Sequence, residues 1–426
     1  MTKVIIIGGG WAGCAAAISA KKAGGDVTII EKTDMLLGLG NVGGIMRNNG
    51  RYTAAEESIH LGAGELFNIC DKVSRHVDID FPGHNHASLY DVNKIEPLVK
   101  KQLEDLGISI LTCRRVTDVV KVKNKITKVV LSDKSHIEGD VFIETTGSTG
   151  PMGNCLKYGN GCAMCILRCP SYGPRVSITE RCGIEDVLGQ RNNGSYGAFS
   201  GSCKLNKETL SKDLQKELND KGVVILTVPK EDVNLEKLDL KVCQQYSLKE
   251  FAEKIILLDT GHAKLMTPFY PLDKLRKIKG LENVKFEDPY SGGLGNSIRY
   301  LSIAPRYNNM KVEGIDNLLC GGEKSGFFVG HTEAIVTGSL AGHNSIRLSL
   351  GMPLLELPRN LASGDIIAYA NEETKSIEGL KKRFTFAGSI YFNRMKELGL
   401  YTIDKEKIKD KIIRLGLLNI YEDKIV

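Results

Sequence analysis

Five cysteines lie within 28 residues of the chain, at spacings that suit a metal centre or thiol redox chemistry. Residues 147–182 read GSTGPMGNCLKYGNGCAMCILRCPSYGPRVSITERC, with Cys162-x-x-Cys165-x-x-x-Cys169 at the centre. A C-x-x-C pair followed by Cys-Pro resembles the cluster-binding run of ferredoxins, although the last spacing is three residues where ferredoxins mostly use two. The pattern predicts a [4Fe–4S] cluster held by Cys155, Cys162, Cys165 and Cys169, with Cys182 as the rival for Cys155.

Other chemistries of these thiols stay open. The same four thiolates could hold structural zinc. Cys162 and Cys165 could instead form a dithiol that cycles against a redox cofactor. Cys203 follows the group and is a candidate substrate-facing, catalytic thiol. His84 and His86 could ligate a metal, but a Gly-His-Asn-His turn is more often a solvated loop.

A dinucleotide site is predicted at the start of the chain. An apolar run, Val4 to Ile7, enters Gly8-x-Gly10-x-x-Gly13 and an alanine-rich helix, and a second β-branched run ends at Glu31. These glycines permit a tight turn, close approach of a pyrophosphate and close packing of helix on strand. The helix N-terminus offers N–H groups to the phosphates, and Glu31 can accept the ribose hydroxyls.

Two later segments favour FAD over NAD. Residues 108–140 are expected to form a β-meander that leads into an apolar strand ending at Thr146-Gly147. An apolar strand, a glycine turn and a small-residue helix follow from Ile315 onward, and both segments resemble motifs of large FAD-binding flavoproteins. The glycine pattern in residues 37–44 follows an acidic strand end, so it predicts a loop against the flavin, not a second nucleotide site. The residues expected at the FAD site are Gly8, Gly10, Trp11, Ala12, Gly13, Glu31, Lys32, Gly40, Gly43, Val116, Thr146, Gly147, Gly322, Glu323, Gly330, Glu333 and Ala334.

The amino-acid composition is typical of a soluble globular protein. The chain has 426 residues, of which 42% are hydrophobic and 25% charged, as is ordinary for soluble globular proteins. Eleven cysteines without a recognisable signal segment favour an intracellular, cytoplasmic protein over a disulfide scaffold. No apolar stretch approaches the roughly 20 residues that span a bilayer. The net charge of +6 permits an RNA partner without requiring one. Oligomeric state stays open, and the expected electron donors are NAD(P)H, a ferredoxin or a thioredoxin-like protein.

Four segments in order resemble one known group. They are IKGLENVKF from Ile278, GEKSGFFVGHTEA from Gly322, GSLAGHN from Gly338 and PLLELPRNLASG from Pro353. Together they resemble the FAD-dependent tRNA-modifying proteins, namely the folate-dependent tRNA uracil-5-methyltransferases and glucose-inhibited division protein A. The resemblance implies FAD as cofactor and, as one alternative function, folate- and FAD-dependent methylation of uracil C5 in RNA.

The chain also departs from that group. RNA-methylating members carry a cysteine in the loop after the residue matching Glu31, whereas residues 41–47 here read NVGGIMR. Their second cysteine corresponds to Cys203 only in a loose alignment. The group lacks a dense cysteine cluster, and the last 55 or so residues fit neither relative. These departures suggest different chemistry on a shared scaffold.

The sequence therefore predicts an α/β flavoprotein. Residues 1–150 and 290–370 form a Rossmann-type, glutathione-reductase-like FAD domain; residues 151–289 form a cysteine-rich, mixed α+β insertion; residues 371–426 form a helical C-terminal extension. The leading function is an FAD-dependent oxidoreductase with a [4Fe–4S] cluster. The alternatives are the RNA methylase and a flavin-linked disulfide reductase acting on a protein partner.

Overall fold

A computed structural model describes residues 1–147, 171–196, 198–199, 202–268, 270–288 and 299–426. The four predicted cluster ligands, Cys155, Cys162, Cys165 and Cys169, lie outside the described residues.

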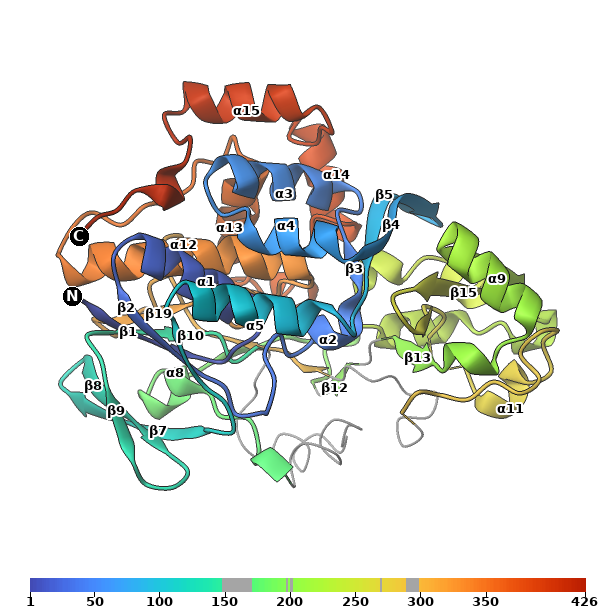
Figure 1. Ribbon diagram of the computed structural model, residues 1–426, viewed down its shortest axis with the longest axis horizontal. Helices are drawn as coiled ribbons and strands as arrows, with labels where there is room; N and C mark the ends of the chain where they lie inside the picture. The colour runs from blue at the N-terminus through green and yellow to red at the C-terminus, as the bar shows by residue number, and fades with distance from the viewer. Residues whose placement is uncertain (148–170, 197, 200–201, 269, 289–298) are drawn as a thin grey trace.

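A five-stranded parallel sheet forms the centre of the molecule (Figure 1). Its order is β19 (Leu318–Cys320), β10 (Val141–Glu144), β1 (Lys3–Ile7), β2 (Asp26–Ile30) and β6 (Ser109–Leu111). Strands of this kind are continuous apolar runs because both faces of the sheet are covered. Val4 and Ile6 of β1 belong to the core shared with the helices, whereas Ile5 and Ile7 pack on the opposite side. The parallel α/β fold predicted from the sequence is confirmed.

Two helices cross at very short range on one face of this sheet. They are α1 (Trp11–Lys22) and α12 (His331–Ser349). A Cβ added at Gly338 would lie 2.2 Å from the carbonyl oxygen of Ala12, and one at Gly342 would lie 2.2 Å from that of Ala16. Glycine is required at both positions because the backbones touch. Helix α5 (Ile95–Asp105) covers the same face.

The β-meander covers the other face. Strands β7 (Val116–Val122), β8 (Lys125–Leu131) and β9 (His136–Glu138) pair antiparallel, as predicted. Their buried residues Val116, Ile126 and Val129 pack against Ile5 and Ile7. The first strand of the expected meander, β6, instead extends the parallel sheet by pairing with β2.

A separate antiparallel sheet lies to the right in Figure 1. Its order is β13 (Cys203–Leu205), β16 (Ala263–Leu265), β15 (Lys254–Asp259) and β14 (Val223–Thr227). It has its own hydrophobic core, completed by α9 (Lys212–Lys221) and α11 (Leu272–Leu275). Short elements join this part to the rest: α8 (Ile178–Arg181), α10 (Glu250–Glu253), β11 (Val187–Leu188), β12 (Ala198–Phe199), β17 (Arg299–Tyr300), β18 (Ser302–Ile303) and the 3₁₀ turns η1 (Lys207–Thr209), η2 (Lys230–Asp232), η3 (Leu235–Leu240) and η4 (Gln244–Tyr246).

The N-terminal half contributes further helices and a three-stranded sheet. The helices are α2 (Gly40–Gly43), α3 (Gly50–His60) and α4 (Glu65–Lys72). The sheet consists of β3 (Ile45–Met46), β5 (His84–Tyr90) and β4 (Ser74–Phe81).

The C-terminal helices are part of the main core and not an appendage to it. They are α13 (Ala362–Glu373), α14 (Ser389–Glu397) and α15 (Lys405–Arg414), with the 3₁₀ turns η7 (Gly379–Lys381) and η8 (Ile420–Glu422). Tyr391, Met395, Ile408 and Ile412 are buried in the same hydrophobic cluster as α1 and β1. In Figure 1, α15 lies above α3, whereas α13 and α14 are drawn at about the level of α3.

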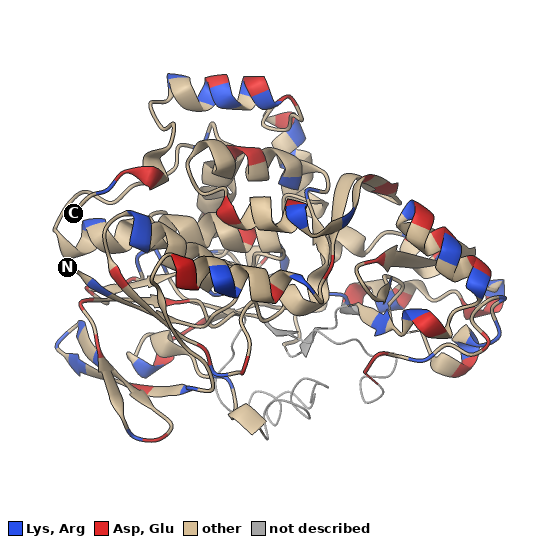
Figure 2. Ribbon diagram, in the orientation of Figure 1, with Lys and Arg blue, Asp and Glu red and all other residues tan. Residues whose placement is uncertain are grey.

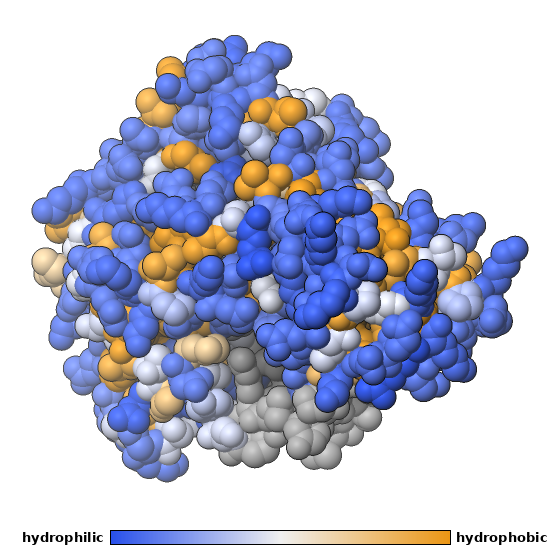
Figure 3. All heavy atoms as spheres, turned by 45° about the vertical axis from the view of Figure 1, so that its right-hand side comes forward, coloured by the Kyte–Doolittle hydropathy of each residue, from blue (hydrophilic) through white to orange (hydrophobic). Residues whose placement is uncertain are grey.

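The surface is polar and of mixed charge. Basic and acidic side chains alternate along α9 and α15 (Figure 2), and hydrophobic residues appear only in separate groups on the face drawn in Figure 3. Among the described residues, no helix is long and apolar enough to span a membrane.

Candidate functional site

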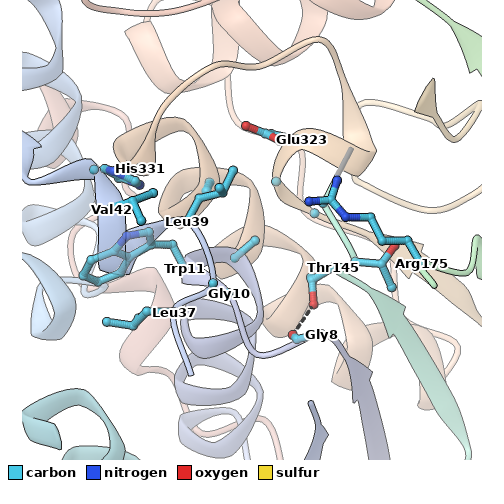
Figure 4. A pocket seen from close by; sticks show the side chains of 18 of the residues that line it. Gly8, Gly10, Trp11, Leu37, Leu39, Val42, Thr145, Arg175, Glu323 and His331 are labelled. Carbon is cyan, nitrogen blue, oxygen red and sulfur yellow. Dashed lines mark hydrogen bonds between the residues drawn. The ribbon is translucent and has the colours of Figure 1, made fainter. Parts of the chain in front are cut away.

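A large cavity opens at the carboxyl ends of β1, β2 and β10, the usual ligand position in open parallel sheets. Its wall combines the glycine loop, the start of α12 and residues of the inserted region (Figure 4). The lining residues are Ile7, Gly8, Gly10, Trp11, Ala12, Ile30, Glu31, Lys32, Thr33, Leu37, Gly38, Leu39, Val42, Gly43, Ile45, Arg51, Arg114, Arg115, Val116, Thr145, Thr146, Gly147, Pro174, Arg175, Val176, Ser202, Cys243, Gln245, Tyr246, Lys264, Gly321, Gly322, Glu323, Val329, Gly330, His331 and Ala334.

The glycine loop has the geometry that a dinucleotide requires. Gly8 has φ +106°, and a Cβ there would lie 2.5 Å from the carbonyl oxygen of Thr145. A Cβ at Gly13 would lie 1.9 Å from the carbonyl oxygen of Gly8, so Gly13 serves helix packing and does not line the cavity. A Cβ at Gly10 would meet no atom within 4 Å, which leaves the backbone at the start of α1 open to a ligand. No side chain caps α1, so its first N–H groups suit a pyrophosphate.

Glu31 is fixed at the ribose position. One carboxylate oxygen, Oε2, accepts the Gly9 N–H at 2.8 Å, and Oε1 accepts the N–H and hydroxyl of Thr33, each at 2.8 Å. Oε1 already accepts two hydrogen bonds and Oε2 only one, so Oε2 keeps a lone pair with which Glu31 can also accept a ribose hydroxyl. The donor set and the open glycine backbone thus fit the adenosine and pyrophosphate of FAD.

Six cationic side chains line the cavity. Arg51 pairs with Glu333 and Lys264 donates to the Val42 carbonyl. Of the other four, the sequence predicted only Lys32 for the site. The others are Arg114, Arg115 and Arg175. The Lys32 ammonium donates to the Gly173 carbonyl at 3.2 Å, and Arg115 donates to the Pro174 carbonyl at 3.4 Å. These residues come from three segments far apart in the chain, and they suit a ligand that carries phosphates.

The opposite side of the cavity is apolar and aromatic. Figure 4 shows Trp11, Leu37, Leu39, Val42 and His331 together, across from Arg175, Thr145 and Gly8. The Trp11 and His331 rings lie 5.9 Å apart between centroids. An apolar wall opposite a phosphate-binding side fits a molecule with a flat ring system at one end.

Two glycines expected against the flavin leave room for aromatic rings of the cavity wall. A Cβ at Gly40 would lie 2.5 Å from Nε1 of Trp11, and one at Gly43 would lie 1.7 Å from Nε2 of His331. Gly43 still lines the cavity, whereas Gly40 does not. The missing side chains make room for two aromatic rings of the wall.

Glu333, another residue expected at the cofactor, lies behind the wall. Its carboxylate pairs with Arg51 at 3.2 Å and accepts the Thr385 hydroxyl at 2.7 Å and the Phe386 N–H at 2.9 Å. It is 1% exposed, so it neutralises the buried Arg51 guanidinium. Val116, Thr146, Gly147, Gly322, Glu323, Gly330 and Ala334 all lie on the wall, together with Gly8, Gly10, Trp11, Ala12, Glu31 and Lys32.

Among the described residues, the cysteine that lines the cavity is Cys243, which the sequence did not indicate. Cys203, the expected substrate-facing thiol, is 2% exposed in the hydrophobic core of the inserted sheet. Its neighbour Ser202 is on the wall, and adjacent side chains of an extended chain point to opposite sides. Cys243 is half-buried and is the cysteine among the described residues that lines the cavity. No spacing pattern marks it, because tertiary folding alone brings it there.

A buried polar network supports the Cys243 segment. His84 was expected in a solvated loop, but it is 1% exposed. Its Nε2 donates to the Gln245 carbonyl at 3.0 Å, and its Nδ1 accepts from the Asn48 amide at 2.9 Å. Burial lowers the pKa of His84 to about 3, so the ring is neutral.

No metal centre is present among the described residues, where no group of three or more His, Cys, Asp or Glu side chains converges. Cys182, the rival cluster ligand, is 2% exposed in a hydrophobic cluster. Burial raises its pKa to about 12, which favours the thiol over the metal-binding thiolate. The iron–sulfur prediction itself rests on cysteines outside the described residues.

Residues on both sides of the cysteine-rich segment line the cavity. Gly147, at one end, and Pro174, near the other, both line the wall. The Glu144 carboxylate ties the two ends together by accepting the N–H groups of Ile178 and Thr179, each at 2.8 Å. Lys324 pairs with Asp186 and lies 3.7 Å from Glu144, all fully buried.

Comparison with known proteins identifies a related family. The family model described as glucose inhibited division protein A matches residues 3–257 and 266–353. The structure of Aquifex aeolicus GidA in one crystal form superimposes with a TM-score of 0.64 at 17% sequence identity, over 97% of this chain and 76% of that chain. A second crystal form gives a TM-score of 0.60 at 16% identity, over 97% of this chain and 78% of that chain. No curated protein sequence matches the chain. These matches confirm the expected flavoprotein fold.

Proposed function

Because the chain belongs to the glucose-inhibited division protein A family, we propose that it is an FAD-dependent enzyme that modifies a uridine in tRNA. One observation carries the proposal: a single cavity joins a dinucleotide loop, phosphate-binding cations and a thiol, Cys243. Flavin and nucleic acid both carry phosphates and flat heteroaromatic rings, which suit the basic and aromatic sides of this cavity.

The protein's own groups have separate roles in this proposal. The backbone at Gly8 to Gly10 binds the pyrophosphate and Glu31 binds the adenosine ribose. Bound FAD supplies two-electron redox chemistry. The Cys243 thiol gives its proton to solvent, and its sulfur forms a bond to C6 of the uracil, which places negative charge at C5 and O4. C5 then forms a bond to the one-carbon unit of methylenetetrahydrofolate, whose nitrogen leaves. The C5 proton passes to solvent and the C6–S bond breaks, which restores the C5–C6 double bond. Two electrons from NADH, passed through bound FAD, would reduce the one-carbon unit to a methyl group.

The test is an RNA modification assay. FAD-loaded protein is incubated with unmodified tRNA carrying tritium at uridine C5, with NADH and methylenetetrahydrofolate added in turn. We expect tritium release that Cys243→Ser lowers by about 100-fold or more, since a nucleophile is lost. The matched control is Cys113→Ser, because Cys113 is exposed and does not line the cavity. Full activity of Cys243→Ser, or no modification under any condition, contradicts the proposal.

An iron–sulfur flavoenzyme is the second candidate. It is favoured by the position of Gly147 and Pro174, which bring both ends of the cysteine-rich segment to the cavity wall. A cluster in that segment would then exchange single electrons with the flavin. If Cys162 and Cys165 instead act as a redox dithiol, a disulfide substrate should reoxidise the reduced flavin. Cys162→Ser should abolish this reoxidation.

A further inference from the structure

One buried acceptor, on a residue of the cavity wall, has no hydrogen-bond partner among the residues that the structure describes. Gln245 is 3% exposed and lines the cavity beside Cys243 and Tyr246. Its side-chain oxygen, Oε1, accepts no hydrogen bond from any residue that the structure describes. No sequence motif marks this residue.

The position of Gln245 is nevertheless firmly held. Its carbonyl oxygen accepts the buried His84 Nε2–H at 3.0 Å. Its Cβ lies so close to Gly388 that a Cβ added there would be 2.7 Å away. The His84 ring is in turn fixed by the Asn48 amide at 2.9 Å. The amide of Gln245 is therefore carried on a rigid backbone, as a preorganised binding group must be.

A ligand donor is the natural partner of this oxygen. Leaving a buried acceptor unpaired destabilises a protein, and native proteins pair nearly all such groups. The cationic groups of the wall, such as Lys32, Arg115 and Arg175, can only donate. A glutamine amide differs because it presents an acceptor and a donor side by side.

We propose that the Gln245 amide binds a cyclic imide edge, accepting from the ring N–H and donating to the adjacent carbonyl. Two molecules of the proposed function carry this edge, the pyrimidine ring of the isoalloxazine and the uracil base. The inference thus rests on the proposed function. It adds Gln245 as the residue that recognises the ring by hydrogen bonds to its imide edge. Gln245 is a specificity-determining residue for that ring, separate from the nucleophile Cys243.

The first arm of the test measures flavin binding and needs no RNA. FAD and 3-methyl-FAD, which lacks the imide N–H, are titrated into apoprotein by flavin fluorescence. If the ring is the flavin, the wild type binds FAD about tenfold more tightly than 3-methyl-FAD, and Gln245→Leu removes that difference. Gln245→Leu also shifts the flavin absorption spectrum and its midpoint potential, which a purely structural role leaves unchanged.

The second arm measures RNA binding without turnover. An RNA stem-loop with uridine or 3-methyluridine at the target position is titrated into FAD-loaded protein. If the ring is uracil, the wild type prefers uridine by about tenfold and Gln245→Leu loses this preference while flavin discrimination stays intact. Failure of RNA to bind contradicts the proposed function and leaves the flavin result standing.

Matched variants keep the result interpretable. Gln244→Leu alters the neighbouring glutamine of the same turn, which does not line the cavity, and should retain both preferences. Gln245→Asn keeps an amide but moves it back by one carbon, so it should lose the same preference while unfolding at the wild-type temperature. Unchanged preferences in Gln245→Leu and Gln245→Asn, in both arms, overturn the proposal.

Discussion

The imidazole of His84 shows how one side chain can hold a site together. It lies between Asn48, Gln245 and the aromatic rings of Phe81 and Tyr246, whose centroids are 4.8 and 4.7 Å away. The hydrogen bonds require a neutral ring with its proton on Nε2, because Nδ1 faces an amide donor. Protonation of Nδ1 would therefore remove the hydrogen bond from Asn48 and destabilise the segment that carries Cys243 and Gln245.

This predicts a loss of stability in acid. Burial lowers the pKa of His84 from 6.5 to about 3. Between these two pH values His84 is protonated in the unfolded chain but neutral in the folded chain. Stability from this residue is complete above pH 6.5 and falls as the pH drops, by about 2 kcal/mol at pH 5. Urea unfolding at pH 7 and pH 5 should show that loss in the wild type and in the control His86→Gln, and a smaller one in His84→Gln. Equal losses in all three proteins contradict the prediction.

Glu31 carries a second prediction at this scale. Glu31→Ala removes the acceptor for the ribose hydroxyls and should weaken FAD binding by about 10–100-fold, measured by fluorescence titration. Glu96→Ala is the matched control, because Glu96 accepts the Leu36 N–H at 3.0 Å but is not on the cavity wall. A similar effect of both changes would mean that Glu31 acts only by holding the loop.

At the scale of elements, the crossing of α1 and α12 decides the shape of the site. Both helices begin at the cavity, with Trp11 and His331 as their first residues. Their separation is set by Gly338 and Gly342, whose Cα atoms pack against the backbone of α1. The two N-termini, and the aromatic rings they carry, are therefore placed by two glycines more than a turn away from the ligand.

Gly338→Ala should push the two helices apart. Its Cβ would lie 2.2 Å from the Ala12 carbonyl oxygen, which is backbone and cannot rotate away. We expect destabilisation of about 1–3 kcal/mol together with weaker FAD binding, measured by thermal unfolding with and without FAD. Gly64→Ala is the control, since its Cβ would have no neighbour closer than 3.2 Å. A wild-type melting temperature for Gly338→Ala contradicts the prediction.

At the scale of the whole molecule, three parts of the chain meet at one cavity. The FAD-type sheet supplies the glycine loop, the inserted region supplies Ser202, Cys243 and Gln245, and the C-terminal part packs behind the wall through Thr385 and Gly388. The C-terminal helices share the main hydrophobic core. Deletion of the C-terminal helices should therefore unfold the whole protein.

The cysteine-rich segment gives the prediction for the whole protein. Anaerobic purification should yield about four irons and four sulfides per FAD if Cys155, Cys162, Cys165 and Cys169 bind a cluster. Cys162→Ser should then lose the iron, and Cys113→Ser should keep it. Flavin absorbance without iron in the wild type would exclude the cluster, and zinc analysis with thiol titration would separate a structural site from a dithiol.

The sequence by itself determined the parts of this protein that are local. The strand, glycine loop, helix and Glu31 are adjacent in the chain, and each residue type follows from a backbone or hydrogen-bond requirement within that unit. The pairing of β7, β8 and β9 was predictable for the same reason, and the fold class and the family followed from motifs that each lie within one short segment. Only the tertiary structure decided which thiol faces the cavity, why Gly40 and Gly43 are glycines, and where Arg175, His84 and Gln245 lie. These depend on contacts between segments up to hundreds of residues apart, and burial reverses what a local pattern suggests: His84 becomes a buried support, and Cys203 a core residue.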